Sequence, residues 1–229
     1  CILPFEVDFY ARFGMQVDYI GNPLLDEISA FRADADFATK NPATKPVIAL
    51  LPGSRKQEIE KLLPVMLEVV PDFPDHQFII AGAPSFSPEY YNRFTTDVPV
   101  LFDQTYNLLS HAKAAVVTSG TATLETALFN VPEVVIYKAH PLFIWIGRLV
   151  VKIKFISLVN LIAGKKVVEE LIQEDCNRNR IGEELKKLMT NEGSAEMESD
   201  YRELHKLMGA QGASARAAAI IFETAKKVS

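Results

Sequence analysis

The chain has 229 residues, of which 48% are hydrophobic, and its formal net charge is −5 at pH 7. This length is enough to bury one large core or two small ones. The negative charge disfavours a surface that follows nucleic-acid phosphates, so we expect no nucleic-acid partner.

The cysteines and histidines indicate neither a disulfide nor a metal site. Cys1 and Cys176 lie far apart and form no C-x-x-C motif, and the histidines never occur at the spacing of paired metal ligands. We therefore expect a cytoplasmic protein with no metal and no cofactor. The chain begins with Cys1 instead of Met and nothing in it resembles a signal peptide, so we expect a processed or partial polypeptide.

The first 46 residues do not form a sheet of their own. Ile2–Glu6 predicts the end of a strand, and Asp18–Pro23 predicts a short strand and a turn. Because neither has a partner strand nearby, we expect residues 1–22 to be the remnant of a domain that precedes this chain. Residues 23–46 predict a linker, since the segment from Ala33 to Pro46 is polar and poor in large apolar groups.

Residues 47–190 alternate between short apolar runs and stretches with helical spacing. This alternation predicts an α/β fold, a Rossmann-like parallel sheet flanked by helices. The expected strands are Val47–Leu51, Phe78–Ala81, Val98–Phe102, Ala114–Val117 and Val134–Tyr137. The expected helices are Gln57–Val70, bent at Pro64, then Pro88–Phe94, Tyr106–Ala112 and Ala122–Phe129.

From Gly164 onward the strand pattern fades, and residues 191–229 predict a helical C-terminal annex. The expected helices are Val167–Ile172, Arg180–Met189, Glu196–Met208 and Ala213–Lys227. Before them, Pro141–Ile162 is strongly apolar, but basic side chains leave no charge-free run near the roughly 18 residues that span a bilayer. Two alternatives stay open for it: a core helix, or a face with Phe143 and Trp145 that contacts lipid.

Two strand-to-helix turns predict binding sites for phosphate groups. The first is Gly53-Ser54-Arg55 and the second is Ser119-Gly120-Thr121, each directly after an apolar run. A helix N-terminus presents free N–H groups and a positive dipole end to an anion. Two such turns on neighbouring strands suit a diphosphate. Neither is a G-x-G-x-x-G or G-x-x-x-x-G-K-[ST] motif, which disfavours hydride transfer and nucleotide hydrolysis.

For each side chain near these turns, the sequence leaves both a functional role and a structural role open. Ser54 and Gln57 have the spacing of a capping box, so Ser54 has a structural role as an alternative. Arg55 offers a planar fork to phosphate oxygens, and the alternative is an ordinary surface arginine. Glu125 lacks a Ser or Thr three residues before it, so a capping box does not explain it. It suits a pair of ribose hydroxyls, and the alternative is a solvent-facing or salt-bridged glutamate.

Asn160 is a polar side chain among apolar neighbours. If it is buried, its amide needs partners, which either a backbone turn or a ligand supplies, and the residues alone leave both open. Composition gives Gln173 little claim to a role.

Taken together, these motifs resemble the lipid-A-disaccharide synthase family, in the order in which that family has them. The resemblance covers nearly the whole chain. It rests on Leu3-Pro4-Phe5-Glu6, Gly21-Asn22-Pro23-Leu24, Leu50-Leu51-Pro52-Gly53-Ser54-Arg55, Ser119-Gly120-Thr121-Ala122-Thr123-Leu124-Glu125, Asn160-Leu161-Ile162-Ala163-Gly164 and Glu170-Leu171-Ile172-Gln173.

The resemblance implies the C-terminal, donor-binding half of a GT-B fold, in which two Rossmann-like domains face each other. It implies an inverting glycosyltransferase that joins UDP-2,3-diacylglucosamine to 2,3-diacylglucosamine 1-phosphate, forming lipid A disaccharide 1-phosphate and UDP. The implied partners are a UDP-sugar lipid donor and a lipid acceptor. Peripheral contact with the inner membrane and a homodimer are further expectations, and no metal is expected at the site.

Carried over by position, Gly53, Ser54 and Arg55 resemble the loop that meets the donor diphosphate, and the turn from Ser119 through Gly120 to Thr121 resembles its second phosphate site. Glu125 resembles the ribose-binding acid, and Asn160 and Gln173 fall in motifs that line the donor pocket. Arg55 is the expected catalytic residue, because it offsets charge on the departing diphosphate. We expect the general base to lie outside this chain.

Three departures from the family pattern affect loop geometry: Asn22 replaces histidine, and Val159 and Glu169 replace prolines. The family's N-terminal Glu-Ala-Ser-Gly-Asp motif is absent, so we expect this chain alone to bind UDP or a UDP-sugar weakly and to turn over nothing. The alternatives are another sugar-nucleotide enzyme of the same architecture, such as an epimerase or a peptidoglycan glycosyltransferase, or a non-catalytic UDP-sugar-binding module.

Overall fold

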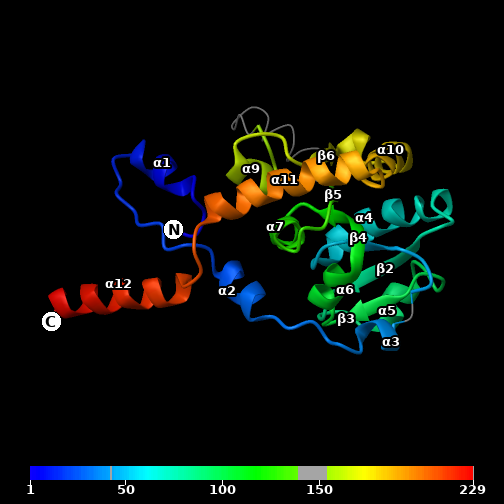
Figure 1. Ribbon diagram of the computed structural model, residues 1–229, viewed down its shortest axis with the longest axis horizontal. Helices are drawn as coiled ribbons and strands as arrows, with labels where there is room; N and C mark the ends of the chain where they lie inside the picture. Colours follow the sequence, from blue (N-terminus) through cyan, green and yellow to red (C-terminus); the bar gives the residue numbers. More distant parts are fainter. Residues whose placement is uncertain (42, 139–153, 229) are drawn as a thin grey trace.

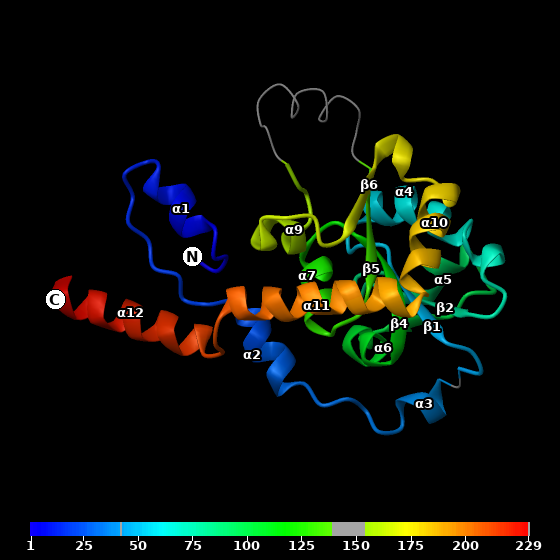
Figure 2. The ribbon, with the colours of Figure 1, turned by 45° about the horizontal axis from the view of Figure 1, so that its top comes forward.

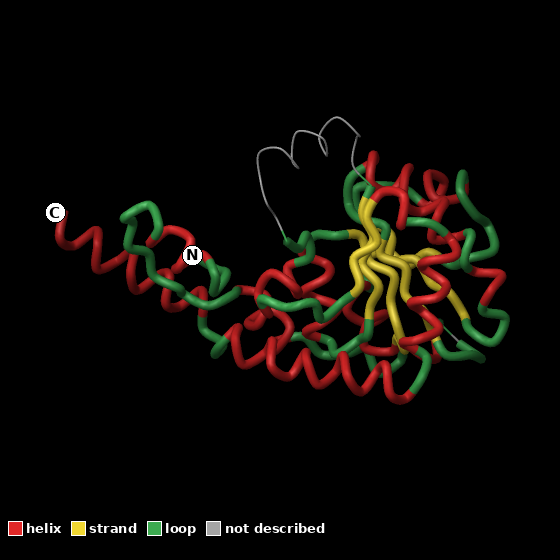
Figure 3. The backbone as a smooth tube through the Cα atoms, turned by 90° about the horizontal axis from the view of Figure 1, so that it is seen from above, coloured by secondary structure: helices red, strands yellow, loops and turns green. Residues whose placement is uncertain are grey.

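The computed structural model describes residues 1–41, 43–138 and 154–228. Within them, six parallel strands form one sheet in the order β3-β2-β1-β4-β5-β6, and helices cover both of its faces (Figure 3). This confirms the Rossmann-like sheet. The strands are β1 (Val47–Leu51), β2 (Gln77–Gly82), β3 (Val100–Phe102), β4 (Ala112–Thr118), β5 (Glu133–Tyr137) and β6 (Glu169–Ile172).

The helices that flank the sheet lie between and after the strands (Figure 1). They are α4 (Lys56–Leu67), α5 (Pro88–Asn92), α6 (Thr105–His111), α7 (Thr121–Leu128), α9 (Leu158–Ala163), α10 (Arg178–Leu188) and α11 (Asn191–Met208). Short 3₁₀ turns, η1 (Val70–Asp72) and η2 (Gln173–Asp175), follow α4 and β6. All four helices expected between Gln57 and Phe129 are present, and Pro64 lies inside α4.

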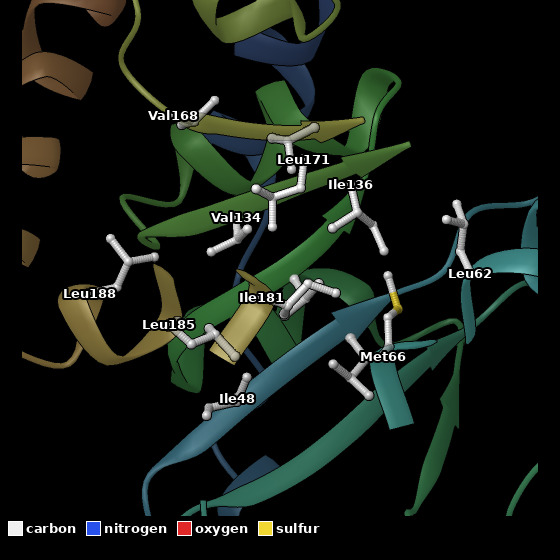
Figure 4. Close-up of a cluster of buried hydrophobic side chains, with 14 of the residues drawn as sticks. Ile48, Leu62, Met66, Val134, Ile136, Val168, Leu171, Ile181, Leu185 and Leu188 are labelled. Carbon is white, nitrogen blue, oxygen red and sulfur yellow. The ribbon is translucent and has the colours of Figure 1, made fainter. Parts of the chain in front are cut away.

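Alternate residues of the central strands face two separate apolar cores. In β1, Ile48 and Leu50 pack on the side of α4, α7 and α10, whereas Ala49 and Leu51 pack on the side of α6. Every residue of β1 is buried, as expected for a central parallel strand covered on both faces. Figure 4 shows the larger core, in which Ile48 and residues of α4, α10, β5 and β6 meet.

The helix predicted over Val167–Ile172 is wrong, because Glu169–Ile172 forms β6. This edge strand pairs in parallel with β5 and places Leu171 beside Ile136. Just before it, the N–H groups of Val167 and Val168 donate to the side chain of Asn160. A local sequence preference therefore gives way to long-range pairing, as it often does for short segments.

The strand predictions for Ile2–Glu6 and Asp18–Pro23 are also wrong. Glu6 begins the helix α1 (Glu6–Ala11), and its carboxylate accepts from the N–H groups of Ile2 and Leu3. Asn22 caps the helix α2 (Pro23–Ala30) by accepting from the Leu24 N–H at 3.0 Å, and proline occupies the first helical position, which it favours. A third helix, α3 (Phe37–Lys40), lies before the sheet.

The expected C-terminal helices are present as α11 and α12 (Ala213–Val228). Helix α12 extends away from the sheet on the side where α1 and α2 lie (Figures 1 and 2). Arg216 of α12 donates to the carbonyl oxygen of Ile20, and Asp26 of α2 accepts from the N–H of Gly212.

Candidate lipid contacts Phe143 and Trp145, within Pro141–Ile162, lie outside the described residues, which leave a gap at 139–153. No helix in the described part of the chain is both long and apolar enough to span a bilayer.

Candidate functional site

A pocket with a volume of about 360 Å³ opens at the carboxyl ends of β1, β2 and β4. We call it the carboxyl-end pocket. It lies where the strand order changes direction, between β1 and β4, which is the usual ligand position in open α/β sheets. Its lining residues are Leu51, Gly53, Ser54, Arg55, Glu58, Ala81, Gly82, Ala83, Pro84, Thr105, Thr118, Ser119, Gly120, Thr121, Ala122 and Glu125.

The structure brings seven of the nine residues expected from the sequence into this one pocket. They come from the two turns and from Glu125, whereas Asn160 and Gln173 are not among the lining residues. Strands β1 and β4 are direct neighbours, with Leu51 beside Val117. The two turns therefore lie side by side at the same edge of the sheet.

The second turn leads into the N-terminus of α7 without a side-chain cap. Gly120 is the N-cap residue, and no side chain accepts from the first turn. The N–H groups of Thr121 and Ala122 belong to the first turn of α7 and therefore have no carbonyl acceptor within the helix. They are free to meet an anion at the positive end of the helix dipole.

The first turn needs a glycine for two reasons. Gly53 has a φ of +95°, a conformation that L side chains rarely adopt. A Cβ at this position would also lie 3.1 Å from the Cβ of Glu58. The backbone of Gly53 consequently passes close to the helix that follows it.

The predicted capping box between Ser54 and Gln57 is wrong, because Arg55 is the N-cap of α4 and Glu58 is its third helical residue. Glu58 accepts from the Arg55 N–H at 3.2 Å and from the Arg55 guanidinium at 2.8 Å. The Arg55 side chain is nevertheless 81% exposed. Arg55 thus stands at the pocket, paired with an acid that also lines it.

Glu125 lies in the second turn of α7 and is half-buried. Its Oε1 accepts from the hydroxyl of Tyr106 at 2.8 Å. Burial raises the pKa of Glu125, the Tyr106 hydrogen bond lowers it, and the charge of Glu27 raises it. Burial likewise raises the pKa of Tyr106, and its hydrogen bond to Glu125 adds to the shift. Tyr106 therefore stays protonated and holds the carboxylate in place.

The Asn160 side chain is fully buried and uses its polar atoms within the chain. Its Nδ2 donates to the Val168 carbonyl at 2.9 Å and to the Glu170 carboxylate at 2.8 Å, while its Oδ1 accepts from the N–H groups of Val167 and Val168. Of the two alternatives left open by the sequence, these contacts support the backbone turn. Gln173 follows β6 in η2, with a φ of +57°.

The sequence-based predictions did not single out three residues that bear on the carboxyl-end pocket, namely Glu58 and Thr118, which line it, and Tyr106, which contacts Glu125. Glu58 is detectable in principle, since an acid at the third helical position is a capping signal. Tyr106 and Thr118 are not, because their roles depend on which elements pack together. Thr118 ends β4 and is 3% exposed, and its hydroxyl has no hydrogen-bond partner among the described residues.

Comparison with known proteins identifies the family. A family model described as lipid-A-disaccharide synthetase matches residues 1–223. The chain belongs to this family. The lipid-A-disaccharide synthase of Myxococcus xanthus is 36% identical over 234 residues, which cover 97% of this chain and 61% of that protein. The enzyme of the same name from Nitrosococcus oceani is 38% identical, with 91% and 57% covered. The chain thus spans about 60% of the length of these relatives.

Solved structures of other proteins have a similar fold. A putative UDP-N-acetylglucosamine 2-epimerase from Listeria monocytogenes matches with a TM-score of 0.56 and 13% identity, over 79% of this chain and 47% of that one. The calicheamicin glycosyltransferase CalG4 matches with a TM-score of 0.53 and 17% identity, over 81% and 45%. At such identities, the likeness concerns the fold alone.

Proposed function

We propose that this chain is the donor-binding part of an inverting glycosyltransferase. The reaction joins UDP-2,3-diacylglucosamine to 2,3-diacylglucosamine 1-phosphate, giving lipid A disaccharide 1-phosphate and UDP. Family membership and the names of the relatives support the reaction. The observation that carries the donor role is the meeting of two phosphate-type turns, Gly53-Ser54-Arg55 and Ser119-Gly120-Thr121, in one pocket.

In this proposal the donor diphosphate lies between the two turns. The N–H groups of Thr121 and Ala122 bind one phosphate at the N-terminus of α7. Arg55 exchanges its ion pair with Glu58 for a bidentate contact with the other phosphate. When UDP departs, the charge that builds on its diphosphate is offset by these same groups, which lowers the barrier to transfer.

Glu125 binds the ribose hydroxyls in this proposal, and Tyr106 fixes the carboxylate for that contact. An acidic residue has this role in many nucleotide-binding folds of the same strand order. Gln173 remains a proposed donor contact on the strength of the family motif. The general base is assigned to no residue of this chain, so transfer needs acceptor-side groups beyond the donor pocket.

We further propose a cytoplasmic location with peripheral contact at the inner membrane, as a lipid donor and a lipid acceptor require, and a homodimer. The fold is shared by epimerases and glycosyltransferases and does not distinguish them. The family match over residues 1–223 favours the lipid enzyme over a peptidoglycan glycosyltransferase or a non-catalytic module.

Calorimetric titration of this chain with UDP and with UMP tests the donor role. We expect UDP to bind about tenfold more tightly than UMP, since the second phosphate gains charge-assisted hydrogen bonds. Turnover by this chain alone is expected to be absent. Equal affinities, or no binding of either nucleotide, would contradict the proposal.

A matched pair of glycine variants locates the site. Gly53→Ala is expected to abolish the preference for UDP, because it strains the first turn and collides with Glu58. Gly209→Ala is the control: Gly209 also has a positive φ, of +76°, but ends α11 away from the pocket. Loss of the preference in both variants would show a general loss of structure instead of a local one.

A further inference from the structure

One buried hydroxyl in the carboxyl-end pocket has no partner among the described residues. Thr118 is 3% exposed, and its Oγ1 makes no hydrogen bond to any residue that the structure describes. The fully buried threonines of α7 differ in this respect. Thr123 Oγ1 donates to the Gly120 carbonyl at 2.9 Å, and Thr126 Oγ1 donates to the Ala122 carbonyl at 2.7 Å. Among the buried threonines of the described residues, Thr118 is thus the one whose hydroxyl has no partner.

An unpartnered buried hydroxyl opposes folding, because it has left water without a replacement hydrogen bond. Most buried polar groups have partners, so an exception at a pocket calls for an explanation. Valine has nearly the same shape and would fill the same space without this cost. The residue at position 118 is thus better explained by a bound molecule than by packing.

The position of Thr118 indicates which group of that molecule it meets. It is the last residue of β4, immediately before the turn that leads into α7. Its neighbour Ser119 is already engaged, since the Ser119 N–H donates to Ile136 O at 3.0 Å and its Oγ donates to Ile156 O at 3.0 Å. Donors that can meet an anion at this turn include the first N–H groups of α7, the exposed Thr121 hydroxyl and, among the buried side chains, the Thr118 hydroxyl.

We propose that the Thr118 hydroxyl donates a hydrogen bond to a phosphate oxygen of the nucleoside diphosphate in the carboxyl-end pocket. This inference rests on the proposed function, because it needs a diphosphate at the two turns. Thr118 is then a specificity-determining residue for the phosphate part of the ligand. A hydrogen bond to an anionic oxygen is stronger than one between neutral groups, and the buried position strengthens it further.

The proposal predicts opposite effects on stability and on binding. Thr118→Val removes the hydroxyl and keeps the shape, so the ligand-free variant should melt at the same temperature as the unsubstituted chain or above it. Its affinity for UDP should fall roughly tenfold or more. Its affinity for uridine, which has no phosphate, should not change. Thr118→Ser restores a hydroxyl and should bind UDP within about threefold of the unsubstituted chain.

Thr126→Val is the matched control, since Thr126 is equally buried but its hydroxyl bonds within its own helix. It should leave UDP affinity unchanged. Thr118→Ala provides a second variant without a hydroxyl, with the same expected loss of UDP affinity, in case the valine variant does not fold.

The outcomes separate this inference from the proposed function. If the unsubstituted chain does not bind UDP, the proposed function itself fails. If it binds UDP and the variants without a hydroxyl bind equally well, the Thr118 contact is wrong. Equal losses for UDP and uridine would assign the hydroxyl to the nucleoside and overturn the phosphate contact.

Discussion

The two ends of the sheet carry pockets of opposite character. The carboxyl-end pocket is lined by glycine, serine and threonine turns with unpaired donors. A second pocket, which we call the amino-end pocket, has a volume of about 230 Å³ and lies at the starts of β5 and β6, against α10 and α11. Its lining residues are Glu133, Val134, Lys166, Val167, Val168, Glu169, Glu184, Lys187, Leu188, Gly193, Glu196, Met197 and Asp200.

Most charged groups at the amino-end pocket have charged partners, although Oε2 of the buried Glu133 has no hydrogen-bond partner among the described residues. Lys166 pairs with Glu169, and Lys187 donates to Glu184 at 2.8 Å. Glu133 is fully buried there, and burial raises its pKa well above the usual range, with the Tyr201 hydroxyl as a hydrogen-bond partner that lowers it. The contrast teaches that a pocket alone does not indicate a ligand. Unpaired donors at one end suit an anion, while both lysines that line the pocket at the other end are already paired with glutamates.

The largest expected effect is on turnover, at the carboxyl end. Arg55→Ala in the full-length protein should lower the rate of disaccharide formation by about a hundredfold or more, because a preorganised charge at the leaving group is lost. The melting temperature should change little, since the Arg55 side chain is exposed. Lys56→Ala, at the next position, is the control. Unchanged turnover in Arg55→Ala would remove this residue from the mechanism.

The second effect is on stability, at the amino end. Asn160 holds Val167 and Val168, which line the amino-end pocket. Asn160→Ala should lower the free energy of unfolding by about 3 kcal/mol, since it leaves buried backbone groups unpaired. UDP affinity of the folded protein should stay unchanged.

Urea unfolding and UDP titration of Asn160→Ala measure both quantities, and Asn92→Ala serves as the exposed control. An Asn160→Ala protein of normal stability and poor UDP affinity would reverse the comparison. That result would support a role of Asn160 in donor binding, which the family motif implies.

A smaller effect concerns the pH dependence of stability. Glu133 has a raised pKa in the folded protein, so the folded state holds a proton that the unfolded state releases above about pH 4.5. Its contribution to stability should therefore fall as the pH rises from there toward the folded pKa, by up to about 1.4 kcal/mol per pH unit. Glu133→Gln should remove this slope and be the more stable protein at neutral pH. Parallel slopes for both proteins in urea unfolding from pH 5 to 8 would contradict a protonated Glu133.

The smallest effect is expected for the exposed lysine of an ion pair at the amino end. Lys187 pairs with Glu184, but its side chain is 66% exposed. Because Lys187 is exposed and Arg180 also lies 3.6 Å from the buried Glu184, Lys187→Ala should lower the melting temperature only slightly and leave UDP affinity unchanged. A clear loss of UDP affinity would show that the two ends of the sheet are coupled.

The same contrast explains what the sequence could predict. Strand β1 and the segment Ala114–Val117 of β4 are runs of buried apolar residues, and a glycine turn follows each strand, so both the strands and the phosphate-type turns were detectable. Strand β6 contains two glutamates in four residues and exists because it pairs with β5. The link from Tyr106 to Glu125 joins α6 to α7, and no spacing in the sequence encodes it. Local sequence patterns therefore could not predict contacts between elements that are distant in the sequence and meet only in the folded protein.

A crystal structure of this chain with UDP tests the central claim most directly. We predict that the diphosphate lies in the carboxyl-end pocket, between Gly53-Ser54-Arg55 and Ser119-Gly120-Thr121, with the ribose at Glu125. Density for UDP in the amino-end pocket, or anywhere away from the two turns, would contradict the account.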